Sequence, residues 1–119
     1  MKKLIVIFIF LFIIILPTTA FSKTNFNGTW ETNWGLMYLT QKNNIVIGTY
    51  EYNNGKLKGT ISGNKLTYTW NEYNNKYSYS GTGYFIIKKD NSLYGQWKNE
   101  GVATWEGEWT ATRSNTKTI

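Results

Sequence analysis

Asp and Glu carboxylates are the main candidate catalytic groups in this sequence, because it contains no histidine and no cysteine. Ser–His or Cys–His triads and zinc sites of the usual ligands cannot be built from these residues. A glycosidase needs two carboxylates facing one cleft. Glu51, Glu106 and Glu108 are predicted on the outer face of strands. Glu72 and Glu100 could reach the aromatic end of the predicted fold from their loops, but nothing in the sequence pairs them. We therefore expect no enzyme activity, no metal site and no cofactor.

Aromatic side chains are the other candidates for function, since Phe, Trp and Tyr make up 18% of the sequence. Many belong to a repeated unit in which a glycine lies between two apolar positions, as in Leu93-x-Gly95-x-Trp97. Glycine weakens a strand interior, so its recurrence indicates strong bending or close approach of neighbouring groups.

Short strands must position these residues, because Asn- and Gly-rich turn signals recur every 10 to 12 residues and no helical periodicity is present. The pattern predicts an all-β fold of eight strands. A single bent strand over residues 27–41 is the alternative, which would leave seven. The eight predicted strands are 27–33, 36–41, 45–52, 56–62, 65–72, 77–88, 92–98 and 103–113.

The strands alternate between apolar and polar residues, which predicts an antiparallel up-and-down meander with one buried face. Open edges would promote aggregation, so we favour a closed barrel, with residues near Thr29–Glu31 bonded to residues near Thr110–Thr112. An open sheet or two-layer sandwich is the alternative. The residues expected to face inward are Trp30, Val46, Leu57, Ile61, Leu66, Tyr68, Trp70, Phe85, Leu93, Trp97 and Trp109.

Strand direction assigns these residues to two ends. One end, the base, is aliphatic and also holds Trp30. The other end, the mouth, is aromatic. Between them lies a belt of glycines, which either makes room for the rings of a filled core or leaves a cavity under the mouth. The glycines of this belt are Gly48, Gly59, Gly81, Gly83, Gly95 and Gly107. The candidate ligand-binding residues of the mouth are Trp34, Tyr50, Tyr52, Trp70, Tyr79, Trp97 and Trp105.

The first 22 residues resemble a secretory signal peptide, with Lys2 and Lys3 before an apolar run of 13 residues. Cleavage is expected after Ala20 or Ser22, and an uncleaved anchor is the alternative. Residues 23–113 are then one barrel domain and residues 114–119 a polar tail. We expect a secreted or periplasmic protein without stable membrane insertion after cleavage.

The formal net charge of +6 falls to +4 without Lys2 and Lys3. The basic residues are scattered and almost all are lysine, which argues against a nucleic-acid partner.

Gly28-x-Trp30 in the first strand, together with Arg113 at the end of the last, resembles the signature of the calycins, which include lipocalins, avidins and bacterial metalloprotease inhibitors. The resemblance implies that Arg113 lies across Trp30 and closes the base. "GTWETNWG" and "GTYEY" are similar to avidin strands. Tyr50 matches a biotin-contacting tyrosine, but the avidin pattern fails at Thr32, Leu36 and Tyr52, which argues against biotin.

The favoured function is binding of a small aromatic or sugar-like ligand at the mouth. The alternatives are a protein-binding module, such as a calycin-type hydrolase inhibitor, and a structural barrel with a filled core. If the mouth binds a ligand, Trp34 is expected to be partly exposed and close to Trp70 or Trp97.

Overall fold

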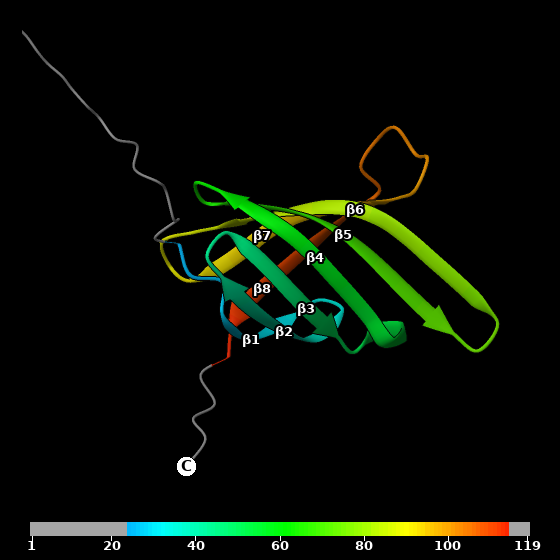
Figure 1. Cartoon of the computed structure of the whole chain (residues 1–119), viewed down its shortest axis with the longest axis horizontal. Coiled ribbons are helices and arrows are strands. Elements are labelled where there is room, and N and C mark those ends of the chain that lie inside the picture. The colour runs from blue at the N-terminus through cyan, green and yellow to red at the C-terminus, as the bar shows by residue number, and fades with distance from the viewer. Residues whose placement is uncertain (1–23, 115–119) are drawn as a thin grey trace, which may run out of the picture.

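A computed structural model describes residues 24–114, which form a closed barrel of eight antiparallel strands in sequence order (Figure 1). The predicted signal peptide and residues 115–119 of the predicted tail lie outside the described residues. Among those described, no helix has the length and apolar character to cross a membrane. The elements are β1 (Gly28–Thr32), β2 (Gly35–Lys42), β3 (Ile45–Tyr50), the 3-10 helix η1 (Tyr52–Asn54), β4 (Gly55–Ser62), β5 (Lys65–Asn74), β6 (Tyr77–Ile87), β7 (Ser92–Asn99) and β8 (Gly107–Arg113).

The barrel closes between β1 and β8, as the alternation predicts. Trp30, Glu31 and Thr32 pair with Arg113, Thr112 and Ala111 respectively, so each of the two paired ranges lies one residue further along the chain than expected. The sheet has no free edge, so the open-sheet and sandwich alternatives are wrong. The corner between β1 and β2 is a real turn, since Thr32 pairs with Gly35 and Gly35 has a φ of +92°. The chain therefore has eight strands rather than seven.

The lower barrel is filled by side chains. Every residue predicted to face inward is buried except Trp97, which is partly buried against the core. The glycine belt makes this packing possible: a Cβ on Gly83 would overlap the Tyr68 hydroxyl, and one on Gly95 would overlap the Tyr84 carbonyl oxygen. Below the mouth, glycines such as Gly83 make room for packed rings.

The base is closed by two fully buried aromatic side chains, Trp30 and Phe26. The Trp30 indole N–H donates to the Phe26 carbonyl at 3.0 Å, and the Phe26 N–H donates to the Gln41 side chain at 2.7 Å. The Arg113 guanidinium lies 4.2 Å from the centre of the Trp30 ring. The predicted Arg113–Trp30 contact is confirmed. The burial of Phe26 was not predicted from the sequence.

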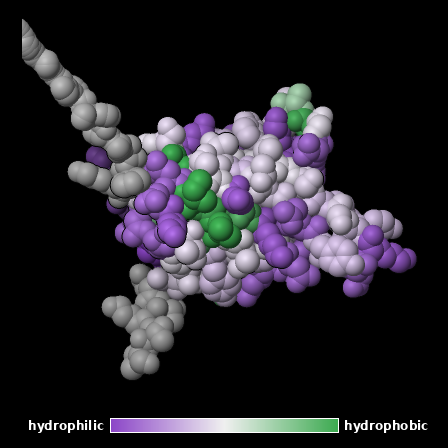
Figure 2. Space-filling model, viewed as in Figure 1, coloured by the Kyte–Doolittle hydropathy of each residue, from purple (hydrophilic) through white to green (hydrophobic). Residues whose placement is uncertain are grey.

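The outer wall is mostly polar. On the face shown in Figure 2, a small apolar group lies at the upper right and a larger apolar patch lies nearer the centre. It lies over β3, where Ile45 and Ile47 are exposed. Outside this patch, the predicted division into a buried and a solvated face holds for most of the sheet.

Two predicted strand ends are wrong in a way that affects the predicted mouth residues, and β5 also continues to Asn74 rather than ending at residue 72. β8 begins at Gly107 rather than at residue 103, because the chain leaves the ladder at the Trp97–Gly107 pair and forms a loop over residues 100–106. β3 ends at Tyr50, and Tyr52 lies in η1. In both places, the inward and outward alternation of the strand no longer determines where the next aromatic side chain points.

Candidate functional site

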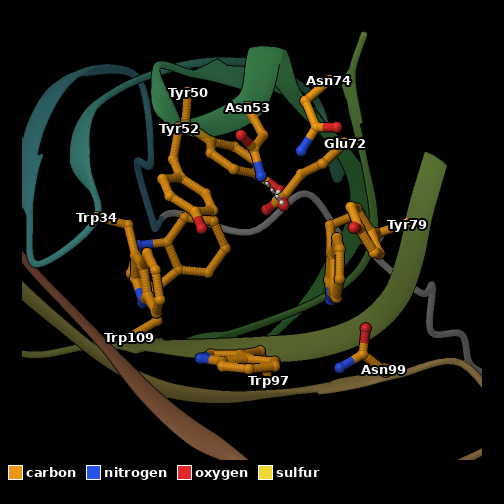
Figure 3. Close-up of a pocket in the computed structure, with 11 residues that line it drawn as sticks. Trp34, Tyr50, Tyr52, Asn53, Glu72, Asn74, Tyr79, Trp97, Asn99 and Trp109 are labelled. Carbon is orange, nitrogen blue, oxygen red and sulfur yellow. Dashed lines mark hydrogen bonds between the residues drawn. The ribbon is translucent and has the colours of Figure 1, made fainter. Parts of the chain in front are cut away.

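The mouth contains a pocket of about 270 Å³ (Figure 3). It is bounded by the end of β3, by η1 and by the ends of β5 and β7, together with the β1–β2 corner. The size corresponds to a small ligand and lies just below the usual range for binding pockets, which begins at about 300 Å³. The eleven lining residues are Trp34, Tyr50, Tyr52, Asn53, Trp70, Glu72, Asn74, Tyr79, Trp97, Asn99 and Trp109.

Trp109 separates the pocket from the filled core. Its side chain is almost fully buried, and its ring centre lies 4.9 Å from that of Tyr50, 5.1 Å from that of Phe85 and 5.8 Å from that of Tyr68. These edge-to-face and tilted contacts join the floor of the pocket to the aromatic packing below. The floor is therefore held rigidly by the fold.

Four aromatic rings follow one another around the pocket, and we call them the aromatic wall: Tyr52, Trp34, Trp97 and Trp70. Successive ring centres are 4.8, 6.1 and 6.2 Å apart. The Trp34 and Trp97 planes meet at 82°, and the Trp97 and Trp70 planes at 88°. Because each of these two angles is close to a right angle, Trp34, Trp97 and Trp70 form three sides of the pocket.

Glu72 completes the enclosure from β5. Its carboxylate accepts a hydrogen bond from the Tyr50 hydroxyl at 2.8 Å and a longer one from the Asn53 amide at 3.3 Å. Figure 3 shows Glu72 across the open space from Trp97. The pocket therefore has an acidic side opposite an aromatic one.

Gly55 allows the Tyr50–Glu72 hydrogen bond to form. Tyr50 pairs with Gly55, and the register of β4 on β5 places Gly55 beside Glu72. The Tyr50 ring lies so close over Gly55 that a Cβ there would overlap it. Tyr50 thus reaches across β4 to a residue two strands away.

The environment of Tyr50 keeps its phenol protonated. Burial raises the pKa of Tyr50 strongly, and the hydrogen bond to the Glu72 carboxylate and its negative charge raise it further. The hydroxyl is therefore a donor to Glu72 at any physiological pH and does not act as a base.

The rim of the pocket carries amides. Asn99 is held by Glu106, whose carboxylate accepts from the Asn99 backbone N–H at 2.7 Å and from its side-chain amide at 3.1 Å. Asn74 lies at the end of β5 near Tyr79 of β6 (Figure 3). These groups can donate or accept hydrogen bonds at the entrance.

Three buried polar atoms among the described residues have no hydrogen-bond partner: the Tyr68 hydroxyl and the indole N–H groups of Trp97 and Trp109. An unpartnered buried polar group costs about 1–3 kcal/mol. These three side chains therefore contribute to the barrel through ring packing and not through hydrogen bonds of their polar atoms.

Six of the seven residues predicted at the mouth line this pocket: Trp34, Tyr50, Tyr52, Trp70, Tyr79 and Trp97. Trp34 is half-buried and lies close to Trp97, as predicted. Trp105, the seventh predicted residue, does not line the pocket. This residue lies in the 100–106 loop, its ring is 5.3 Å from that of Tyr84, and Lys98 lies over its face.

The polar residues of the lining were not predicted as site residues, although Glu72 was expected to be able to reach the mouth from a loop. Glu72 and Asn74 continue the alternation of Leu66, Tyr68 and Trp70, so the period of two residues in β5 was a usable signal for them. Asn53 and Asn99 lie where the chain turns out of regular pairing, and no periodic signal exists there. Trp109 was predicted to face inward but was not assigned to the site.

No protein-family model, curated protein or solved structure matches this chain. Among residues 24–114, no group of three or more His, Cys, Asp or Glu side chains could hold a metal ion.

Proposed function

We propose that this chain is an exported, non-enzymatic barrel protein that binds a small ligand at its mouth. The observation that carries the proposal is a pocket of about 270 Å³ walled mainly by Trp and Tyr side chains above a filled core. A barrel needs such rings inside to fold, but it does not need four of them arranged around open space. Aromatic walls with a few polar groups are typical of small-molecule sites.

Two features support the calycin resemblance and export. The Arg113 guanidinium covers the Trp30 ring at the base, as that resemblance implies. The charged and apolar pattern of the first 22 residues favours a secreted or periplasmic location.

The absence of a catalytic role is proposed from the chemistry of the lining. Glu72 is the one acidic side chain among the described residues that line the pocket, so it has no second carboxylate there for glycosidic chemistry. Its hydrogen-bond partners, Tyr50 and Asn53, are neutral donors. This arrangement suits recognition of a ligand rather than transfer of protons.

A ligand panel read by tryptophan fluorescence tests the proposal. The panel contains monosaccharides and disaccharides, small aromatic compounds and organic cations, each titrated into the purified mature protein. Binding should change the emission of the tryptophans that line the pocket. A saturable change with at least one compound is expected, and no change with any compound would overturn the proposal.

The β5–β6 hairpin supports a second candidate, a protein-binding module. The hairpin projects beyond the barrel (Figure 1), and Tyr73, Tyr77 and Tyr79 on it are 56%, 58% and 42% exposed. Exposed tyrosines are common in protein interfaces. Inhibition assays against a set of secreted proteases and glycosidases test this candidate, with Tyr77→Ser expected to abolish any inhibition that the wild type shows.

A further inference from the structure

Glu72 is the one formally charged side chain among the described residues that line the pocket. It is half-buried, and its two hydrogen bonds come from neutral groups. A carboxylate offers about four acceptor positions, so two remain for a ligand. Withdrawing such a group from water without a cationic partner is unfavourable. A positively charged ligand would provide that partner, whereas an anion would be repelled.

The aromatic wall suits the same kind of ligand. The face of an aromatic ring carries negative electrostatic potential and attracts a cation within about 6 Å of its centre, most strongly for tryptophan. Trp34, Trp97 and Trp70 meet at near-right angles, so they can present ring surface from three directions. Glu72 lies on the remaining side (Figure 3).

Most charges of the described chain, Glu72 included, lie near one of the two ends of the barrel, and Glu31 and Lys58 lie between the ends. Near the mouth are five acidic residues and three lysines: Glu51, Glu72, Glu100, Glu106, Glu108, Lys56, Lys76 and Lys98. Near the base are five basic residues and one acid: Lys42, Lys65, Lys88, Lys89, Arg113 and Asp90. This distribution makes the mouth the more negative end of a basic protein and attracts cations toward it.

We infer that the mouth binds a methylated ammonium ion, with the cationic group inside the aromatic wall and facing Glu72. The inference rests on the proposed function, because it names the ligand class of the same pocket. A bare ammonium is strongly hydrated and needs many acceptors. Methylation weakens that hydration and gives the cation an apolar surface that rings can contact. The pocket offers more ring surface than acceptors, which favours the methylated form.

Choline and 3,3-dimethyl-1-butanol provide the direct test, because the two compounds have nearly the same shape and differ in the positive charge. Each is titrated into the mature protein at low ionic strength, with calorimetry and tryptophan fluorescence as readouts. We expect choline to bind at least tenfold more tightly than the alcohol. Glu72→Gln should weaken choline binding at least tenfold. Glu100→Gln, a mouth variant outside the lining, should change it less than twofold.

The outcomes separate this inference from the proposed function. Equal binding of choline and the uncharged alcohol would overturn the inference that the ligand is a cation, but the proposal of a small-ligand pocket would stand. Binding of a neutral sugar or aromatic compound, with no binding of choline, would have the same meaning. If no compound of the panel binds, both proposals fall. The choline–alcohol comparison uses only the wild-type chain, so it decides the question even if Glu72→Gln does not fold.

Discussion

At the scale of single residues, Trp34 and Trp105 can be compared as a test residue and its control. Both are partly exposed tryptophans near the mouth, but Trp34 lines the pocket and Trp105 packs on the outer face against Tyr84. Trp34→Ala should weaken choline binding by about 1 kcal/mol or more, because part of the wall is lost. Trp105→Ala should leave the binding constant unchanged. Calorimetric titration of the two variants measures the difference.

Thermal melts of the same variants complete this test. Trp34→Ala should lower the melting temperature only slightly, since much of that ring faces the pocket. A large loss of stability with unchanged binding would show that Trp34 is a lid on the core rather than a binding residue.

Tyr68 gives a prediction about stability alone. Its hydroxyl is buried beside Gly83 without a hydrogen-bond partner, and its ring contacts the rings of Phe85 and Trp109. Tyr68→Phe removes the polar atom and keeps the ring, so the free energy of unfolding should stay the same or rise by up to about 1 kcal/mol. Urea unfolding measures it. A clear loss of stability would mean that the hydroxyl is hydrogen-bonded in solution.

Arg113 stabilises the base through several contacts. Its guanidinium covers the Trp30 ring and donates to the backbone carbonyls of Asn25, at 2.8 Å, and Asn27. Arg113→Ala should lower the free energy of unfolding by about 2 kcal/mol, because the cation–π contact and the hydrogen bonds are lost together. Choline binding at the opposite end should be nearly unchanged. Arg113→Lys should recover only part of the stability, since lysine lacks the planar fork that reaches both carbonyls.

At the scale of elements, the glycine belt lets strands lie close to the side chains and backbone of their neighbours. A Cβ on Gly95 would overlap the backbone of β6 at Tyr84, which cannot move without breaking the ladder. Gly95→Ala should therefore cost about 3 kcal/mol or more. Gly101 is the control: it has a φ of +82° in the β7–β8 loop with open space around it, so Gly101→Ala should cost about 1–2 kcal/mol. Urea unfolding of both variants compares them.

The buried residues could be predicted from the sequence where apolar and polar residues alternate along a whole strand. In β5, alternation placed Leu66, Tyr68 and Trp70 inside, and the structure buries all three. The prediction failed at residues 103–106, because the apparent alternation of Trp105 with Gly107 continues past the point where pairing stops. There the Glu106 side chain bonds to Asn99 instead, and the chain turns outward. A hydrogen bond between a loop carboxylate and a neighbouring strand has no periodic signature.

At the scale of the whole molecule, the site depends on contacts between distant strands. The aromatic composition of the mouth follows from strand direction, which the sequence supplies. The Tyr50–Glu72 bond does not follow, since it requires Tyr50 to cross over Gly55 to a residue 22 positions away. The angles between Trp34, Trp97 and Trp70 likewise depend on side-chain rotamers set by the closed barrel. Sequence alone therefore indicates an aromatic mouth, and the acidic side of the pocket requires the fold.

The stability of the whole barrel should fall in alkali because of two buried tyrosines. Burial raises the pKa of Tyr68 well above its ordinary value, and burial together with Glu72 raises the pKa of Tyr50. In the unfolded chain both groups ionise near pH 10, whereas in the folded barrel they keep their protons. Above pH 10 the folded state therefore binds more protons than the unfolded state, and each tyrosine lowers the free energy of unfolding by about 1.4 kcal/mol per pH unit. Below pH 10 neither contributes a slope.

Urea unfolding between pH 9 and pH 12, with absorbance of tyrosinate as a second readout, tests this expectation. Tyr68→Phe provides the control, because removing one of the two groups should roughly halve their share of the alkaline slope while the native absorbance titration stays the same. Of the nine tyrosines, Tyr50 and Tyr68 should ionise only as the barrel unfolds. Ionisation of all nine before unfolding would contradict the burial of these two phenols and the Tyr50–Glu72 bond on which the acidic side of the pocket depends.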